Sequence, residues 1–228
     1  MSIVHEWSVP EGILLLALRD REGTIKAGGL YAFALGGAVL AELLLAGRVR
    51  VEEKKQLVAL ADSRPLGDPL LDEALGRIAS AKRRASVRAW LTRFARTRHL
   101  RERIAERLVA KGVLRADEGT LLRVFHRKIY PEIDPVPERE LIGRLRQAVM
   151  GDAPAIEPRT AVLLALARNA EVLPAVFSKD ELKQRKARIR QIADGELIGK
   201  AAAEAIEATR VAIFVAAVMP AVVAGGHH

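Results

Sequence analysis

Apolar residues recur every three or four positions along most of this chain, as expected for amphipathic helices that bury one face. The periodic segments predict helices at 9–18, 35–45, 69–78, 100–111, 138–149, 158–169, 178–192 and 196–218. We therefore expect a mainly α-helical protein with one or two small β-hairpins. It should form a single compact domain over residues 1–228, with its core at about 8–218 and a short flexible C-terminal tail.

Local sequence signals mark several helix ends. Ser8 precedes a proline and Glu11, a combination typical of a helix N-terminus because the serine side chain accepts a bond from a free backbone N–H. Asp68 stands before a proline in the same way. Gly112 follows a basic last turn, where a glycine commonly ends a helix. These signals support the boundaries that the periodicity predicts.

Two stretches predict the β-hairpins. Residues 48–52 alternate polar and apolar side chains with a period of two, and 56–61 can pair with them across a short charged connection. A second hairpin is expected between 113–114 and 121–125. Its turn is expected at 117–119, where the sequence is Asp-Glu-Gly.

Two apolar stretches, 27–41 and 211–224, are each shorter than the roughly 20 residues that a membrane-spanning helix needs. A carboxylate, Glu42, interrupts the first stretch, and a proline interrupts the second. We expect both to be helices buried in a soluble core, with the glycine pairs at 28–29 and 36–37 allowing close packing. A buried Glu42 carboxylate then requires a hydrogen-bond or salt-bridge partner.

The charge of the chain is unevenly distributed. Its 37 Lys and Arg residues exceed its 28 Asp and Glu residues by nine, and the segment 77–111 alone holds 12 basic and 2 acidic residues. The rest of the chain is therefore nearly neutral. A local excess of this kind predicts an anionic partner, such as an acidic lipid, a nucleic acid or an acidic protein.

The sequence excludes several classes of chemistry. It contains no cysteine, so disulfides, thiolate nucleophiles and cysteine metal sites are excluded, and a reducing cytoplasm is a compatible location. Its histidines are dispersed, and the motifs of metalloproteases, phosphate-binding loops and serine hydrolases do not occur. The terminal pair His227 and His228 is as readily a tag remnant as a ligand pair. We therefore expect no enzyme, metal site or cofactor.

The basic segment contains one candidate binding site. Arg98 and Arg101 lie three residues apart on an expected helix, so their guanidinium groups would project from one surface and grip a single phosphate group. The alternative is a solvated helix face with local ion pairs. Arg98 would then pair with Glu102. In the same way, Arg103 would pair with Glu106.

Four stretches of the chain carry a family resemblance. They are 11–23 (EGILLLALRDREG), Glu42-Leu43 leading to Gly47-Arg48, 67–75 (GDPLLDEAL) and 100–114 (LRERIAERLVAKGVL). In this order and spacing the chain resembles the Golgi phosphoprotein 3 family, also called the GPP34 domain. The resemblance implies a single, mainly α-helical domain. It also implies phosphoinositide binding, since the family's eukaryotic members are peripheral Golgi proteins that bind phosphatidylinositol 4-phosphate.

The resemblance further implies the position of a lipid-headgroup site. Two arginines of the family's pocket match Arg98 and Arg101 of this chain. The pocket's third arginine falls at Gly36, and its tryptophan falls at Ala27 or Gly28, so both are missing here. The implied ligand is accordingly a phosphoinositide or a simpler anionic lipid.

Other residues are implied as supporting contacts. Lys26 and Arg21 lie close to the missing tryptophan in the sequence, and we expect them to help hold an anionic headgroup. The family's hydrophobic hairpin, which mediates oligomerisation and can lie near the membrane, corresponds to about 113–125. Its apolar residues here are Leu121, Leu122, Val124 and Phe125.

The expected function is that of a peripheral adaptor in the cytoplasm, associated with the inner face of a membrane through anionic headgroups. Homo-oligomers through the hairpin and contacts with the cytoplasmic tails of membrane enzymes are further expected partners. The bias toward Ala, Arg and Leu is similar to that of a bacterial, actinobacterial-like member. Two alternatives stay open: a nucleic-acid-binding protein that uses the basic helix and hairpin, and a protein-interaction module without lipid binding.

Overall fold

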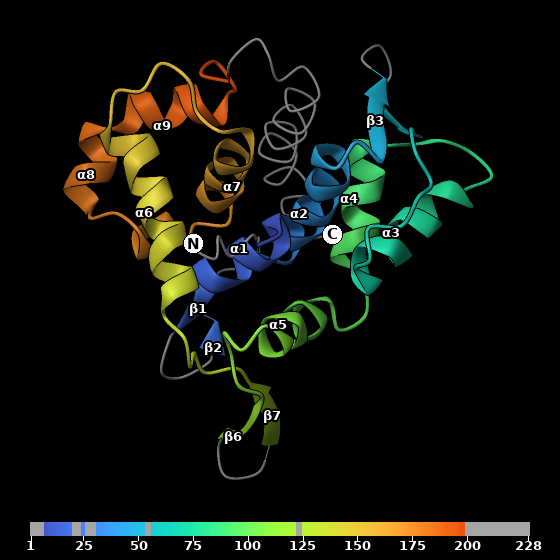
Figure 1. The fold of residues 1–228 in the computed structure, drawn as a ribbon, viewed down its shortest axis with the longest axis horizontal. Helices are drawn as coiled ribbons and strands as arrows, with labels where there is room; N and C mark the ends of the chain where they lie inside the picture. Colours follow the sequence, from blue (N-terminus) through green and yellow to red (C-terminus); the bar gives the residue numbers. More distant parts are fainter. Residues whose placement is uncertain (1–6, 20–23, 26–30, 53–55, 122–124, 199–228) are drawn as a thin grey trace, which may run out of the picture.

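Two apolar helices, α1 (Val9–Ala17) and α2 (Tyr31–Leu45), form the centre of the protein in the computed structural model shown in Figure 1. The structure describes residues 7–19, 24–25, 31–52, 56–121 and 125–198. The other helices of this part are α3 (Pro69–Ala79), α4 (Val87–Ala95), α5 (Leu100–Ala110), α6 (Val136–Met150), α7 (Pro158–Asn169), a 3₁₀ turn η1 (Leu173–Ala175), α8 (Lys179–Gln184) and α9 (Lys186–Ala193). The protein is therefore mainly helical, as the sequence predicts.

In the described part of the chain, three small antiparallel sheets connect the helices. The strands are β1 (Leu18–Arg19) with β2 (Thr24–Ile25), then β3 (Val49–Glu52), β4 (Leu57–Leu60) and β5 (Ala85–Ser86) in that order, and β6 (Asp117–Leu121) with β7 (Phe125–Ile129). The hairpin predicted at 48–61 is confirmed, with Val49 opposite Leu60. Strand β5 has no period-two signal because it contains only two residues.

The core lies around α1 and α2. Every residue of α1 is buried, and α2 packs against α1, α4 and α7. In Figure 1, α6 to α9 lie on one side of this pair, and α3, α4 and the β3–β4–β5 sheet lie on the other. Helix α5 and the β6–β7 hairpin lie below both groups in this view. Within the described ranges, no helix has the length and apolar character needed to cross a membrane.

The predicted helix caps are present. Ser8 Oγ accepts a bond from the backbone N–H of Glu11, and the Glu11 carboxylate accepts one from Ser8 N at 2.7 Å. The Asp68 carboxylate accepts a bond from Leu70 N at 2.9 Å at the start of α3. Gly112 follows α5 with a φ of 73°, a backbone conformation that favours glycine. The boundaries of these helices therefore follow from local chemistry.

The partner predicted for Glu42 is confirmed. This residue is 7% exposed, and its Oε2 atom accepts a bond from the backbone N–H of Val9 at 2.7 Å. The same oxygen accepts a bond from Arg159 Nη1 at 2.6 Å. Since Val9 begins α1 and Arg159 lies in the first turn of α7, this one carboxylate connects three helices.

The packing role predicted for the glycines of α2 is confirmed at Gly36. A Cβ atom placed on Gly36 would lie 2.5 Å from the backbone nitrogen of Ala95 and 2.7 Å from the carbonyl oxygen of Leu91. Both atoms belong to the backbone of α4, which therefore approaches α2 closely at this point. The other glycine pair, at 28–29, lies outside the described residues.

The second hairpin forms at a different place from the one predicted. Strand β6 contains Asp117, Glu118 and Gly119, which pair with Ile129, Lys128 and Arg127, so these residues are a strand and not the turn. The residues between the two strands are 122–124. Residues 113–114 form no regular strand: their N–H groups donate to Leu108 O at the end of α5, and Leu114 forms only an isolated bridge with Glu132. The regular strands of the hairpin therefore begin at Asp117.

Three helix predictions are also corrected. The prediction omits α4, although its buried residues Val87, Trp90, Leu91 and Phe94 have helical spacing. The helix predicted at 178–192 is divided into α8 and α9 at Arg185, whose φ and ψ are −98° and 13°. The helix predicted at 196–218 does not begin at 196, because 196–198 form a turn and a bend. The remainder of that segment lies outside the described residues.

Candidate functional site

A hollow of about 570 Å³ lies between the N-terminal half of α5 and strand β7. Two segments that are distant in the sequence form this hollow. The first is α5 with the turn before it, and the second is strand β7 of the hairpin. The lining residues are Arg98, His99, Glu102, Arg103, Glu106 and Lys128. Three of these residues are Lys or Arg and two are Glu, so the hollow is weakly positive.

Arg98 lies at the mouth of this hollow in an exposed position. It belongs to the turn between α4 and α5 and not to a helix, so the prediction that Arg98 and Arg101 share one helix face is wrong. The reason is the backbone of His99, whose positive φ of 54° separates the two helices. Arg98 Nε donates to His99 Nε2 at 3.0 Å. Among the described residues, no carboxylate forms an ion pair with Arg98.

Arg101 has a different environment in the first turn of α5. Its side chain is 26% exposed, and its Nη2 donates to the backbone oxygen of Lys128 at 3.2 Å. Its guanidinium carbon lies 5.9 Å from the centre of the Tyr130 ring. Arg101 therefore joins α5 to β7, whereas Arg98 is available to a ligand from solvent.

Three buried polar atoms near Arg101 retain hydrogen-bonding capacity. The hydroxyls of Tyr31 and Tyr130 and the Nε atom of Arg101 have no hydrogen-bond partner within the described part of the chain. Burial raises the pKa of both tyrosines, so each hydroxyl is a neutral donor at physiological pH. None of these residues lines the hollow, so the three atoms are not exposed to a ligand there.

The carboxylates at the hollow pair both along α5, where Glu102 Oε1 lies 3.9 Å from Arg101 Nε, and across elements. Lys128 Nζ lies 3.1 Å from Glu106 Oε1, and this hydrogen bond raises the pKa of Lys128, which therefore keeps its charge. Arg103 Nη1 lies 2.7 Å from Glu73 Oε2 of α3. The pair predicted between Arg103 and Glu106 is therefore wrong, because α3 and β7 supply nearer partners.

The position of α5 depends on a buried ionic network. The Glu11 side chain is 0% exposed and lies 2.8 Å from Lys111 Nζ and 3.3 Å from Arg107 Nε. Arg107 Nη1 also lies 2.5 Å from Asp68 Oδ1. Burial alone raises the pKa of Glu11, but the bonds from Lys111 and Ser8 and the two positive charges lower it more. The pKa of Glu11 is thus below 4.5, and α1, α3 and α5 are held together.

This network predicts a pH-dependent stability difference. The substitution Glu11→Gln should lower the free energy of unfolding by about 1 kcal/mol near neutral pH, because charged hydrogen bonds are lost. Since the pKa of Glu11 is lowered in the folded protein, its contribution is complete above about pH 4.5 and decreases as the pH falls below that value. Urea unfolding of both proteins from pH 7 to pH 3 measures the difference. A difference that stays constant over this range would contradict the prediction.

Several residues implied by the family resemblance cannot be placed at this site. Arg21, Lys26, Leu122 and Val124 lie outside the described residues. Leu121 and Phe125 pair with each other at the end of β6 and β7. The expectations for these six residues therefore stay predictions.

Sequence reasoning missed two residues of the hollow. Lys128 lies 27 residues beyond Arg101, and no local pattern connects them before the hairpin is placed beside α5. His99 stands between the two predicted arginines, but its position at the start of α5 depends on its backbone conformation. Both residues contribute through tertiary structure and not through a motif.

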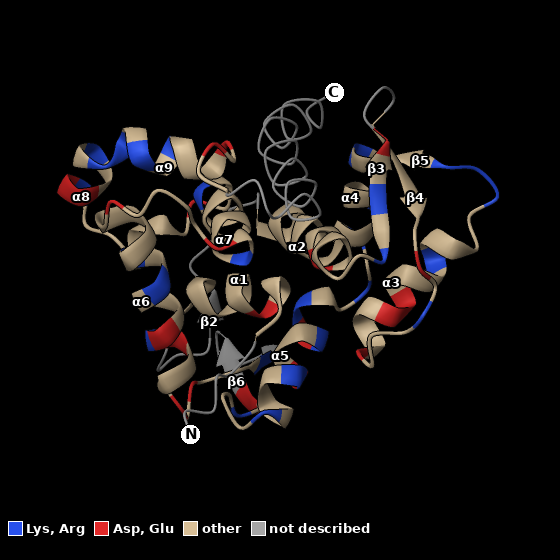
Figure 2. Cartoon of the chain, turned by 45° about the horizontal axis from the view of Figure 1, so that its top comes forward, with Lys and Arg blue, Asp and Glu red and all other residues tan. Residues whose placement is uncertain are grey.

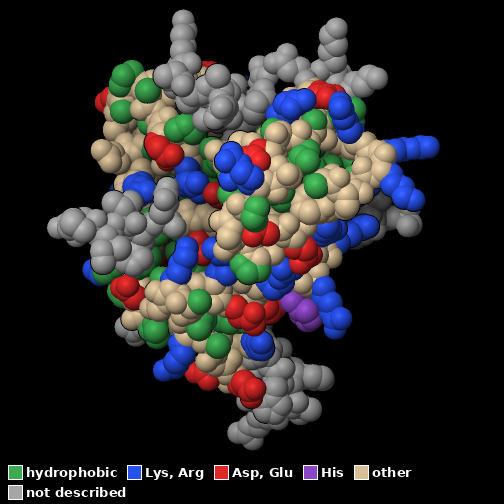
Figure 3. Space-filling view, turned by 45° about the vertical axis from the view of Figure 1, so that its right-hand side comes forward, with side chains coloured by type: hydrophobic (Ala, Val, Ile, Leu, Met, Phe, Trp, Pro, Cys, Tyr) green, Lys and Arg blue, Asp and Glu red, His purple; other side chains and the backbone are tan. Residues whose placement is uncertain are grey.

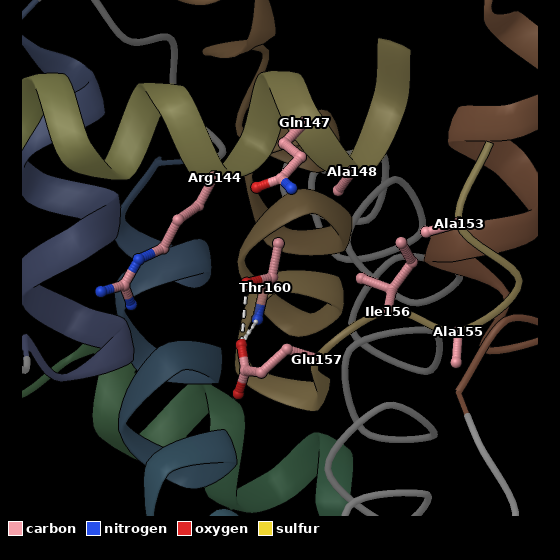
Figure 4. A pocket seen from close by; sticks show the side chains of 8 residues that line it. All are labelled: Arg144, Gln147, Ala148, Ala153, Ala155, Ile156, Glu157 and Thr160. Carbon is pink, nitrogen blue, oxygen red and sulfur yellow. Dashed lines mark hydrogen bonds between the residues drawn. The ribbon is translucent and has the colours of Figure 1, made fainter. Parts of the chain in front are cut away.

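A second hollow, of about 340 Å³, lies between α6 and α7 and is shown in Figure 4. Three of its polar side chains, those of Glu157, Thr160 and Arg144, already have structural partners. Glu157 caps α7 by accepting bonds from Thr160 N and Oγ1 at 2.7 and 2.8 Å, and the guanidinium of Arg144 lies 5.2 Å from the centre of the Trp7 ring. The α5–β7 hollow is therefore the better candidate for ligand binding.

Comparisons with known proteins identify the family of this chain. The family profile of Golgi phosphoprotein 3 (GPP34) matches residues 9–209. The chain is also 26% identical over 209 residues to the vacuolar protein sorting-associated protein 74 of Eremothecium gossypii. This match covers 77% of the chain and 62% of the relative's length, so the chain spans less than two thirds of that relative. The family consists of non-enzymatic adaptor proteins. With nearly its whole length matched by the family profile, the chain belongs to the Golgi phosphoprotein 3 (GPP34) family.

Proposed function

We propose that this protein is a peripheral membrane adaptor that binds phosphorylated lipid headgroups, with phosphatidylinositol 4-phosphate as the reference ligand. The observation that supports this most directly is the exposed Arg98 at a hollow that Arg103 and Lys128 also line, with Arg101 bonded to the backbone of Lys128 beside it. Family membership adds support, since adaptors of this family bind this lipid. The match of both arginines to the family's pocket is the sequence argument for the same site.

The chemistry of the hollow favours a phosphate group over a carboxylate. A phosphate monoester carries nearly two negative charges and three acceptor oxygens, which suits a guanidinium fork and an ammonium group in one place. Arg98 can contribute its free donors, and Lys128 can contribute its positive charge. The carboxylates of Glu102 and Glu106 at the same hollow would repel anionic groups. This repulsion would limit the nonspecific binding of weakly charged headgroups.

The absence of the third pocket arginine is structural. The α4 backbone occupies the space where a side chain on Gly36 would begin, so no arginine fits at this position. We infer that headgroup affinity is lower than in a complete pocket.

The adaptor role requires further contacts that we also propose. In Figure 1 the β6–β7 hairpin extends away from the helices, which suits a contact with a second copy of the chain or with the bilayer. Cytoplasmic tails of membrane enzymes are the proposed protein cargo. In a bacterial host, which the composition predicts, the membrane would be the inner face of the cell membrane.

The substitution Arg98→Ala tests the proposed function. Loss of one charged phosphate contact should weaken binding to phosphatidylcholine vesicles containing phosphatidylinositol 4-phosphate by about tenfold or more. Vesicle flotation over a series of lipid concentrations measures this affinity. The control is Lys183→Ala, which removes an exposed charge from α8 and should bind as the unchanged protein does. Equal binding by Arg98→Ala and the control would overturn the proposal.

A nucleic-acid assay distinguishes the main alternative. A basic surface without a specific site binds nucleic acid weakly and loses this binding as salt increases. We therefore expect no tight gel shift at physiological salt. Sequence-selective binding under these conditions would replace the lipid proposal.

A further inference from the structure

A long acid-free segment extends beyond the proposed headgroup site. Residues 74–101 contain nine Lys and Arg residues and no Asp or Glu. This segment covers the end of α3, the loop before β5, all of α4 and the start of α5. Only Arg98 and Arg101 of these nine belong to the proposed site. The headgroup site therefore does not explain the other seven basic residues.

The outer face of α4 is basic along its length. Its inner face is apolar and is packed against α2, as the burial of Trp90, Leu91 and Phe94 shows. The exposed side of the helix and its last turn present Arg88, Arg93 and Arg96. No acidic side chain from α4 itself lies among them.

The loop before α4 continues this surface. Lys82, Arg83 and Arg84 are all exposed. Arg84 forms an ion pair with Glu52 of β3. Within the described residues, neither Lys82 nor Arg83 has a carboxylate partner. Figure 2 shows this loop as a blue segment that projects at the β5 end of the sheet.

The α4 surface is continuous with the headgroup site. Arg96 ends α4, and Arg98 follows two residues later in the turn to α5. Arg77 of α3 holds this turn, since its Nη1 donates to Thr97 Oγ1 at 3.0 Å. In Figure 3, Lys and Arg side chains recur along the right-hand margin of the face. Because α4 is roughly 13 Å long, the surface extends well beyond one lipid headgroup.

Several basic residues of α8 and α9 bond to neighbouring parts of the chain. On α8 and α9, Arg185 donates to Met150 O at 2.7 Å and Arg188 donates to Ala153 O at 2.5 Å. Arg190 pairs with Asp194. The exposed lysines that remain there, Lys179, Lys183 and Lys186, lie on the far side of α1 and α2 from α4 in Figure 1. They provide a matched control.

We propose that α4 and the loop 82–84 lie directly on an anionic bilayer and bind it without a specific headgroup. This inference rests on the proposed function, because it extends the headgroup site at Arg98 into a second, nonspecific contact. A bilayer suits this surface better than single-stranded nucleic acid does, since the aromatic rings of Trp90 and Phe94 are buried and cannot stack on bases. Each basic residue near an anionic surface strengthens binding by about fivefold. The surface thus offsets the weaker headgroup site.

The test compares two triple variants on two kinds of vesicle. The α4-surface variant combines Lys82→Gln, Arg83→Gln and Arg88→Gln, and the control combines Lys179→Gln, Lys183→Gln and Lys186→Gln. Both remove three exposed charges. Vesicles contain phosphatidylcholine with phosphatidylserine, with or without phosphatidylinositol 4-phosphate. Flotation at low and at physiological salt measures binding, and circular dichroism verifies that both variants fold.

The expected result is a loss on both kinds of vesicle for the α4-surface variant only. On phosphatidylserine vesicles at low salt, its binding should fall by about 50- to 100-fold, and the control should fall by less than about threefold. Equal losses in the two variants would overturn the inference, because they would show general charge attraction. Tighter binding of the unchanged protein to RNA than to vesicles at physiological salt would also overturn it.

The headgroup site and the α4 surface can be tested independently of each other. Arg98→Ala should lose the extra binding that phosphatidylinositol 4-phosphate provides but keep binding to phosphatidylserine vesicles. If the phosphoinositide adds nothing for the unchanged protein, the proposed headgroup site fails. The comparison of the triple variants on phosphatidylserine alone still decides the α4 surface.

Discussion

Replacing Arg159 with Met should lower the free energy of unfolding by about 3 kcal/mol, because Glu42 would keep its charge in the core without its cationic partner. The Glu42 side chain is 9% exposed, so water cannot replace the lost guanidinium. Among the described residues, the backbone N–H of Val9 would then be the one hydrogen-bond donor left to the Glu42 carboxylate. Urea unfolding near neutral pH measures the loss.

A second substitution separates the charge effect from lost packing. In the double variant Arg159→Met with Glu42→Gln, the buried group is neutral and still accepts the bond from Val9. We expect this variant to recover more than half of the lost stability. The control is Arg168→Met, an exposed arginine of α7, which should change stability by less than about 0.5 kcal/mol. No recovery in the double variant would show that packing, and not the buried charge, explains the loss.

The substitution Gly36→Ala should destabilise the protein by about 3 kcal/mol, because an added Cβ meets the α4 backbone. The atoms in contact, Ala95 N and Leu91 O, belong to a helix and cannot move aside as a flexible side chain can. Thermal or urea unfolding measures the effect. A loss of less than 1 kcal/mol would show that α2 and α4 can separate at little cost.

A matched control uses another helical glycine. A Cβ added to Gly143 in α6 meets no atom within 4 Å. Gly143→Ala should therefore raise the free energy of unfolding by about 0.5–1 kcal/mol, since alanine loses less backbone entropy on folding. Opposite signs at the two positions would show that the approach of α4, and not helix propensity, decides the requirement for glycine at Gly36.

This requirement affects the ligand as well as the fold. An arginine at Gly36 cannot be restored by substitution, since its first side-chain carbon already has no space. In the proposed function, lipid binding would therefore depend on Arg98, Arg101 and the surface of α4. The close approach of α2 and α4 at Gly36 leaves no space for an arginine there. It also fixes the position of α4, whose outer face is the proposed bilayer-binding surface.

The candidate site shows how far the sequence allows prediction. The resemblance identified Arg98 and Arg101. In the structure Arg98 lines the hollow, and Arg101 donates to the backbone of Lys128 in β7, the strand beside it. The expected geometry was wrong, because the positive φ of His99 places Arg98 before the helix. Lys128 was not predicted, because its strand approaches α5 only after the hairpin has formed.

The sequence by itself determined the positions of most helices, their caps at Ser8, Asp68 and Gly112, and the need of Glu42 for a partner. These features depend on hydrophobic periodicity and on hydrogen bonds between residues close in the chain. Only the tertiary structure decided that Arg159 is that partner, that Gly36 faces the α4 backbone, and that the strands of the second hairpin begin at Asp117. The physical reason is that each depends on contacts between elements distant in sequence, where close packing and not local pattern selects the neighbour.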